Sequence, residues 1–177
     1  MASKPIDPID ELIDELVDKR RDPLGYAMLA FPWESSKLAE TGPRRWQCEV
    51  MEDILEHLSN PATRYEPLRI AVASGHGIGK SAIVAWLIHF LMATRVDTRM
   101  AVTASTQHQL EDKTWPELGK WHKLLLCKHW FEWSASSYSF AKYPEDQRKN
   151  YRATAATVSK DNTEAFAGLH NEGKTVA

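Results

Sequence analysis

The chain has 177 residues, of which 43% are hydrophobic and 26% charged, and its formal net charge is −2. This length suits one compact domain, and the near-neutral net charge of the whole chain does not by itself indicate nucleic-acid binding. No run of apolar residues is long enough to span a bilayer, and the two cysteines, Cys48 and Cys127, are too few for a disulfide scaffold.

The first predicted element is a helix that begins at Asp7-Pro8, a typical N-cap followed by proline at the first helical position. Its apolar residues recur at helical spacing and form one face: Ile9, Leu12, Ile13, Leu16 and Val17. We expect this face to pack on the body of the chain or, alternatively, to bind a partner subunit.

Residues 22–43 are predicted to form an ordered loop region, because prolines and glycines interrupt them repeatedly. Tyr26, Phe31 and Trp33 would anchor this region. A second helix follows, with an apolar face that runs from Val50 to Leu58 and a stop signal at residues 59–61.

Strands and helices then alternate. We predict a buried strand at Leu68–Ala73, a glycine-rich loop, a helix from Lys80 to about Thr94 and a strand at Met100–Ser105. A further helix over about residues 106–126 and weaker strands at 137–143 and 151–158 complete the pattern. The sequence therefore predicts an α/β fold with a mainly parallel sheet, a right-handed crossover and helices on both faces.

The loop between the first predicted strand and the long helix has the composition of a phosphate-binding loop. Its residues are Ser74, Gly75, His76, Gly77, Ile78, Gly79, Lys80 and Ser81. They match the G-x-x-x-x-G-K-[ST] pattern except that Ser74 stands at the first glycine, which is tolerated if its φ stays negative. The glycines would let backbone N–H groups surround the phosphates of ATP, while Lys80 would bridge the β- and γ-phosphates and the Ser81 hydroxyl would be a ligand of Mg²⁺.

The flanking segments narrow this P-loop NTPase prediction to a family. In order and spacing, five segments resemble the ATPase domain of phage terminase large subunits. They are Phe31-Pro32-Trp33, residues 42–47, the phosphate-binding loop, residues 102–107 and residues 164–170. The resemblance implies an N-terminal helix and ordered loop region over residues 1–43. It also implies a P-loop ATPase core over residues 44–177 that is incomplete at its C-terminus.

The resemblance also implies roles for single residues. Trp46-Gln47 resembles the adenine-recognition motif of these proteins, although Trp46 could instead simply pack before the second helix. Gln107, after the strand that ends at Ser105, is a candidate polar contact. Many terminases have an arginine four residues before the loop lysine, and His76 stands there, either as a plain loop residue or because an arginine elsewhere serves.

The family also uses an acidic strand, with an Asp for Mg²⁺ and a Glu that activates water, and this sequence shows none. We expect that strand to begin at Lys174–Ala177, so the chain resembles a truncated product that also lacks the nuclease domain. It should bind ATP without efficient turnover. The resemblance implies double-stranded phage DNA, the small terminase subunit and the portal as partners, a homo-oligomeric ring when full length, no membrane, and the host cytoplasm as location.

Two other functions remain open, a helicase-like P-loop translocase and a short non-enzymatic protein that binds terminase components. Residues 113–152 are the only basic stretch of the chain, and they also contain several aromatic residues: Trp115, Trp121, Trp130, Phe131 and Trp133. These side chains either contact DNA or form part of the core.

Overall fold

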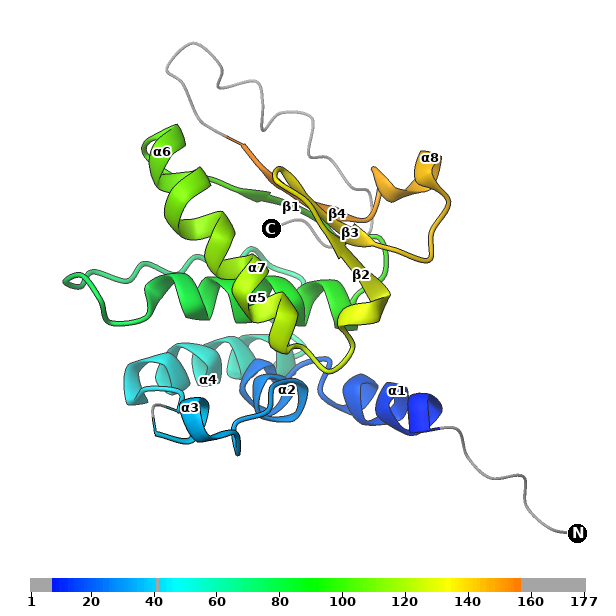
Figure 1. The fold of residues 1–177 in the computed structure, drawn as a ribbon. Coiled ribbons are helices and arrows are strands. Elements are labelled where there is room, and N and C mark those ends of the chain that lie inside the picture. Colours follow the sequence, from blue (N-terminus) through cyan, green and yellow to red (C-terminus); the bar gives the residue numbers. More distant parts are fainter. Residues whose placement is uncertain (1–7, 41, 157–177) are drawn as a thin grey trace, which may run out of the picture.

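The protein is described here from a computed structural model that covers residues 8–40 and 42–156 (Figure 1). The helices are α1 (Pro8–Asp18), α2 (Pro23–Ala30), α3 (Ser36–Ala39), α4 (Arg45–Ser59), α5 (Lys80–Thr94), α6 (Gln107–Gln109), the π-helical turn η1 (Leu110–Thr114), α7 (Trp115–Leu124), the 3₁₀ turn η2 (Lys128–Trp130) and α8 (Glu145–Arg148). The strands are β1 (Arg99–Val102), β2 (Phe131–Trp133), β3 (Ser137–Phe140) and β4 (Arg152–Ala155). The predicted N-cap Asp7, the motif at residues 164–170 and the segment Lys174–Ala177 lie outside the described residues.

The four strands form one mixed sheet in the order β1-β4-β3-β2. Only β1 and β4 are parallel, with Met100 opposite Ala153, whereas β3 runs antiparallel to both β4 and β2. The prediction of a mainly parallel sheet is therefore wrong, although the α/β class is confirmed. The reason is that β3 is antiparallel to both of its neighbours. Strand β2, which was not predicted, pairs with β3 as a local hairpin rather than through a helical crossover.

The long helices α5 and α7 lie on the same face of the sheet (Figure 1). His89 of α5 and His122 of α7 both pack on Tyr138 of β3, with ring centroids 5.0 and 5.5 Å away. Helices α1 to α4 pack beyond α5, away from the sheet (Figure 1). The expectation that long helices cover both faces is not met, because both sheet-packing helices in the described part of the chain share one face.

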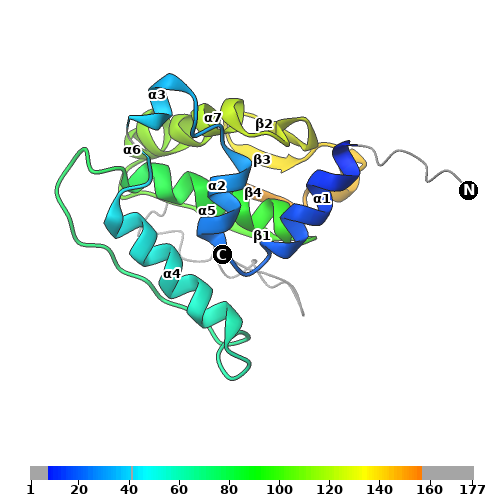
Figure 2. The same cartoon turned by 90° about the horizontal axis from the view of Figure 1, so that it is seen from below.

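The predicted strand at Leu68–Ala73 is absent from the sheet. Its alternating apolar side chains Leu68, Ile70 and Val72 are 43%, 43% and 41% exposed, and the segment has no ladder partner among the described residues. Figure 2 shows it as irregular chain between the end of α4 and the start of α5. An apolar alternation becomes a strand only when another strand satisfies its backbone groups, and within the described residues this segment does not pair with the sheet.

The predicted helices are confirmed at α1, α4 and α5, with α5 running from Lys80 to Thr94 as expected. The region predicted as an ordered loop contains helices α2 and α3. Helix α2 was not predicted because Gly25 and the prolines are typical of irregular chain. The Asp22 side chain caps this helix by accepting a hydrogen bond from Gly25 N at 2.7 Å, and Pro23 occupies the first helical turn. An Asp-Pro signal was thus present in the sequence.

The helix expected over residues 106–126 is continuous from α6 to α7 but contains the π-helical turn η1. Trp115 N donates to Leu110 O, five residues earlier. Pro116, at the second position of α7, has no N–H and cannot continue the regular ladder of hydrogen bonds. The wider turn accommodates this missing donor, and π-turns of this kind are frequent at functional sites.

Tryptophans dominate the core between the helices. Trp121 lies 5.1 Å from Phe31, 5.7 Å from Trp33 and 5.0 Å from Trp86, measured between ring centroids. Of the aromatic residues considered for DNA contact, four are buried in this core: Trp115, Trp121, Trp130 and Phe131. The core alternative therefore holds for these four residues. The fifth, Trp133, is 37% exposed.

Helix α1 packs on the body of the chain through only part of its apolar face. Leu16 is buried and Leu12 packs against the core. Ile13 and Val17 remain 40% and 49% exposed.

Candidate functional site

The glycine-rich loop leads directly into the N-terminus of α5, as the sequence predicted. Gly79 is the N-cap residue, with a left-handed φ of 90°, and Gly77 has a φ of 73°. Residues that carry a side chain rarely adopt such positive φ angles, so both positions favour glycine. Ser74 is not among the residues with positive φ, which confirms the condition under which serine replaces the first glycine of the pattern.

The loop is open on the side where a ligand would approach. A Cβ atom added at Gly75 or Gly77 would meet nothing within 4 Å. Residues 74–77 are exposed, His76 included. A helix N-terminus attracts anions because its first N–H groups have no partner within the helix. The loop therefore leaves open space in front of a helix N-terminus, the kind of position where anions bind in proteins.

Lys80 folds back onto the loop. Its ammonium group donates to Ser74 O at 3.1 Å, to Ser74 Oγ at 2.9 Å and to Gly75 O. These three acceptors are uncharged oxygens, and a cation at a helix N-terminus opposes the helix dipole. An anion in the loop would satisfy Lys80 better than these oxygens do.

Gln47 joins helix α4 to the loop. It is 2% exposed, its Nε2 donates to Gly79 O at 2.9 Å, and its Oε1 accepts from Arg44 N at 2.8 Å. One amide hydrogen and one lone pair are left over, so adenine recognition by Gln47 stays a prediction. The structure adds a role that sequence reasoning missed, since Gln47 holds the carbonyl of the left-handed residue that starts α5.

Trp46 lies next to Gln47 at the start of α4 and is half-buried. Its ring packs against the core. Its indole Nε1 is buried and has no hydrogen-bond partner among the described residues. The position of Trp46 is therefore compatible with both predictions for it, packing before α4 and recognition of adenine.

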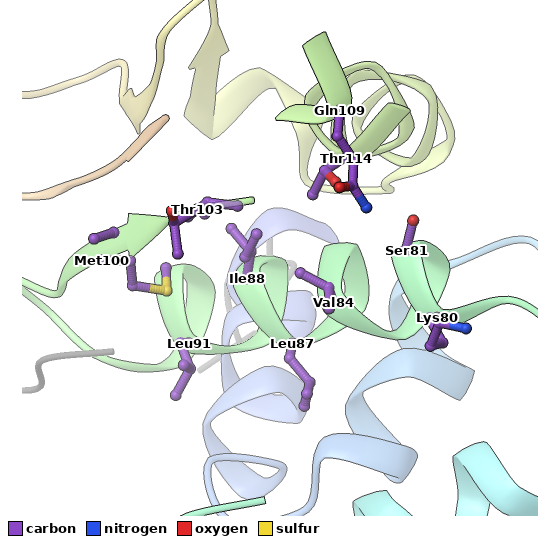
Figure 3. A pocket seen from close by; sticks show the side chains of 12 residues that line it. Lys80, Ser81, Val84, Leu87, Ile88, Leu91, Met100, Thr103, Gln109 and Thr114 are labelled. Carbon is purple, nitrogen blue, oxygen red and sulfur yellow. The ribbon is translucent and has the colours of Figure 1, made fainter. Parts of the chain in front are cut away.

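A groove of about 480 Å³ runs from the start of α5 to β1 (Figure 3). Its apolar part is lined by side chains of α5 and by Met100. At the loop end it is polar, with Lys80, Ser81, Thr103, Gln109 and Thr114. No carboxylate is among the described residues that line it.

The predicted contact Gln107 does not line this groove. Its Nε2 instead donates to Glu111 Oε1 at 2.7 Å on the outside of the helix. Gln109 and Thr114 take the place expected for Gln107. Both glutamines lie in α6, where residues two apart are separated by about 200° around the axis. The local sequence does not show which side of α6 faces the groove.

The strongest pKa perturbations described lie in the core rather than at the loop. Burial, reinforced by the neighbouring His122, lowers the pKa of His89 to about 3. Its Nδ1 lies 2.9 Å from the Tyr138 hydroxyl. Burial also raises the pKa of the Cys127 thiol to about 12, which keeps it protonated and unreactive near neutral pH.

No group of three or more His, Cys, Asp or Glu side chains within residues 8–40 and 42–156 could hold a metal ion by itself. In the same part of the chain, every helix is too short or too polar to cross a membrane. In comparisons with known proteins, no family model, no curated protein and no solved structure matches this chain.

Proposed function

We propose that this chain is the ATP-binding part of a phage DNA-packaging motor, the ATPase of a terminase large subunit. In this proposal, residues 74–81 hold the phosphates of ATP and the complete motor couples hydrolysis to moving double-stranded DNA into the procapsid. The small subunit and the portal are the further partners that the resemblance implies. A helicase-like translocase, which would use the same loop, is the alternative enzyme.

The observation that carries the proposal is the loop at the start of α5. Three features meet at the N-terminus of this 15-residue helix. They are two glycines in the left-handed conformation, open space around the loop backbone, and a lysine whose hydrogen-bond partners are neutral oxygens. Each feature favours an anion, and together they match the demands of a triphosphate.

Binding would proceed by exchange at Lys80. The ammonium group leaves Ser74 and Gly75 and moves to the β- and γ-phosphate oxygens, while loop N–H groups donate to the phosphates. The Ser81 hydroxyl, on the first turn of α5, would hold Mg²⁺ together with the nucleotide. The bound ion would neutralise phosphate charge.

Efficient hydrolysis also needs a general base or a water-positioning group near the terminal phosphate. The described lining of the groove offers Gln109, Thr103 and Thr114 but no carboxylate. We therefore propose that the 177-residue chain binds ATP and turns it over negligibly.

The test is calorimetric titration of the purified chain with Mg-ATP. Lys80→Ala should weaken binding at least tenfold, because a charge-assisted contact to phosphate is lost. Lys123→Ala, at an exposed position of α7, is the matched control and should bind as the unaltered chain does. Binding that is absent, or that survives Lys80→Ala unchanged, would contradict the proposal, as would steady turnover that disappears in Lys80→Ala.

A further inference from the structure

The loop end of the groove has a second polar wall that lies outside the phosphate-loop motif. Gln109 and Thr114 line the groove opposite Ser81. In Figure 3 the carboxamide nitrogen of Gln109 points down toward the first turn of α5, and the Ser81 hydroxyl points up toward Gln109. The two side chains come from different elements and face the same space.

Local hydrogen bonds fix the orientation of Gln109. The Ser105 hydroxyl donates to Gln109 Oε1 at 2.8 Å, and Thr106 Oγ1 accepts from Gln109 N at 3.1 Å. Because the carboxamide oxygen is held on the Ser105 side, the NH₂ group is directed away from it, toward the groove. An NH₂ group carries two hydrogen-bond donors, which suit phosphate oxygens but find no acceptor on an apolar ligand.

The π-helical turn is what puts Gln109 and Thr114 on one wall. In a regular α-helix, residues five apart are separated by about 140° around the axis and face different directions. The bond from Trp115 N to Leu110 O widens the turn, so that five residues exceed one revolution by less than in a regular α-helix and Thr114 comes closer to the side of Gln109. Pro116 supports this arrangement because it cannot donate the regular hydrogen bond.

The wall also stands at the correct end of the sheet. Residues 103–109 follow the carboxyl end of β1, and ligands in open α/β sheets bind at the carboxyl ends of parallel strands. Helix α5 returns toward β1 through residues 95–98, so its N-terminus lies at that same end (Figure 1).

We infer that Gln109 donates a hydrogen bond to the terminal phosphate of a nucleoside triphosphate, so that the groove distinguishes triphosphate from diphosphate. This inference rests on the proposed function, since residues 74–81 must first hold the inner phosphates. Thr114 lines the same wall and offers a hydroxyl to the phosphate or to its water.

The experiment compares the affinities of the full chain for Mg-ATP and Mg-ADP by calorimetry. Gln109→Ala should weaken ATP binding about tenfold, because one hydrogen bond to a charged group is lost, and leave ADP binding within about twofold. Gln109→Glu should weaken ATP binding further, because its carboxylate would face phosphate oxygens. Gln109 is exposed, so both variants should fold, and an unchanged melting temperature checks this.

Gln107→Ala is the matched control. Gln107 lies two residues earlier on the same helix and bonds to Glu111, so its loss should change neither affinity. If Gln109→Ala leaves the ratio of the two affinities unchanged while Lys80→Ala weakens both, the inference is wrong and the proposed function stands. If the unaltered chain binds neither nucleotide through Lys80, the proposed function fails and the inference with it.

Discussion

The two ends of helix α5 have opposite environments. At its N-terminal end the loop is exposed, carries two left-handed glycines and has space around its backbone. Toward its C-terminal end, Trp86, His89 and Phe90 are buried among aromatic rings, and the Tyr151 hydroxyl donates to the Met92 carbonyl. The helix is thus held mainly by its buried middle and C-terminal part, while residues 74–77 of the loop are exposed. A ligand-binding loop on a firmly packed helix can keep its N–H groups open without loss of the fold.

The largest expected effect comes from the packed side of this comparison. Trp121→Ala removes a ring that is 4% exposed and that touches three other aromatic rings, so unfolding should become easier by about 3–5 kcal/mol. Val72→Ala, in the exposed segment before the loop, should cost about 0.5 kcal/mol or less. Urea unfolding measures both. Equal losses would mean that the segment at residues 68–73 is as firmly packed as the core.

The second effect is a pH dependence that arises in the core. His89 is neutral in the folded protein because its pKa is about 3, whereas in the unfolded chain it takes up a proton below its usual pKa of 6.5. The contribution of His89 to stability is therefore fully present above pH 6.5 and is lost as the pH falls toward 3. The loss is about 1.4 kcal/mol per pH unit, or about 2 kcal/mol between pH 6.5 and 5.

His89→Leu should flatten this dependence, whatever its effect at pH 7. Urea unfolding of both proteins at several pH values between 7 and 5 gives the two slopes. Identical slopes would show that His89 is not the responsible group.

A smaller effect is expected within the loop itself. Gly79→Ala places a side chain at φ 90° and sets its Cβ 2.8 Å from Gln47 Nε2, so it should destabilise the protein by about 1–2 kcal/mol. Gly75→Ala meets nothing within 4 Å and needs no positive φ, so it should be close to neutral. Thermal unfolding distinguishes the two. A cost at Gly75 equal to that at Gly79 would contradict the open space described around the loop backbone.

Much of the fold could be predicted where the deciding interactions are local. The helix at Lys80–Thr94 follows from a long, mostly apolar run without Gly or Pro that begins directly after a glycine, and α4 from its apolar face and the stop at Asn60-Pro61. The prediction was wrong where local signals conflicted. In α2, Gly25 indicated irregular chain, but the capping side chain of Asp22 indicated the start of a helix, and the helix forms. The strand β2 has three residues, too few for an alternation to be recognised.

The candidate site divides in the same way. The loop, Lys80 and Ser81 could be located from the sequence because glycine conformations and the first turn of a helix are set by neighbouring residues. Gln47 was predicted beside the loop, but its bond to Gly79 spans 32 residues and only the structure shows it. Gln109 could not be chosen over Gln107, because both lie in α6 and only the tertiary structure decides which side of α6 faces the groove.

The sequence by itself determined the glycine-rich loop, the helix that follows it and the α/β class, since each depends on residues within one or two turns of chain. The tertiary structure alone decided the mixed pairing of the sheet, the exposure of residues 68–73, the burial of four aromatic residues considered for DNA contact, and the polar wall opposite Ser81. These depend on which distant segments supply hydrogen bonds and apolar contacts, and such partners leave no pattern in the local sequence.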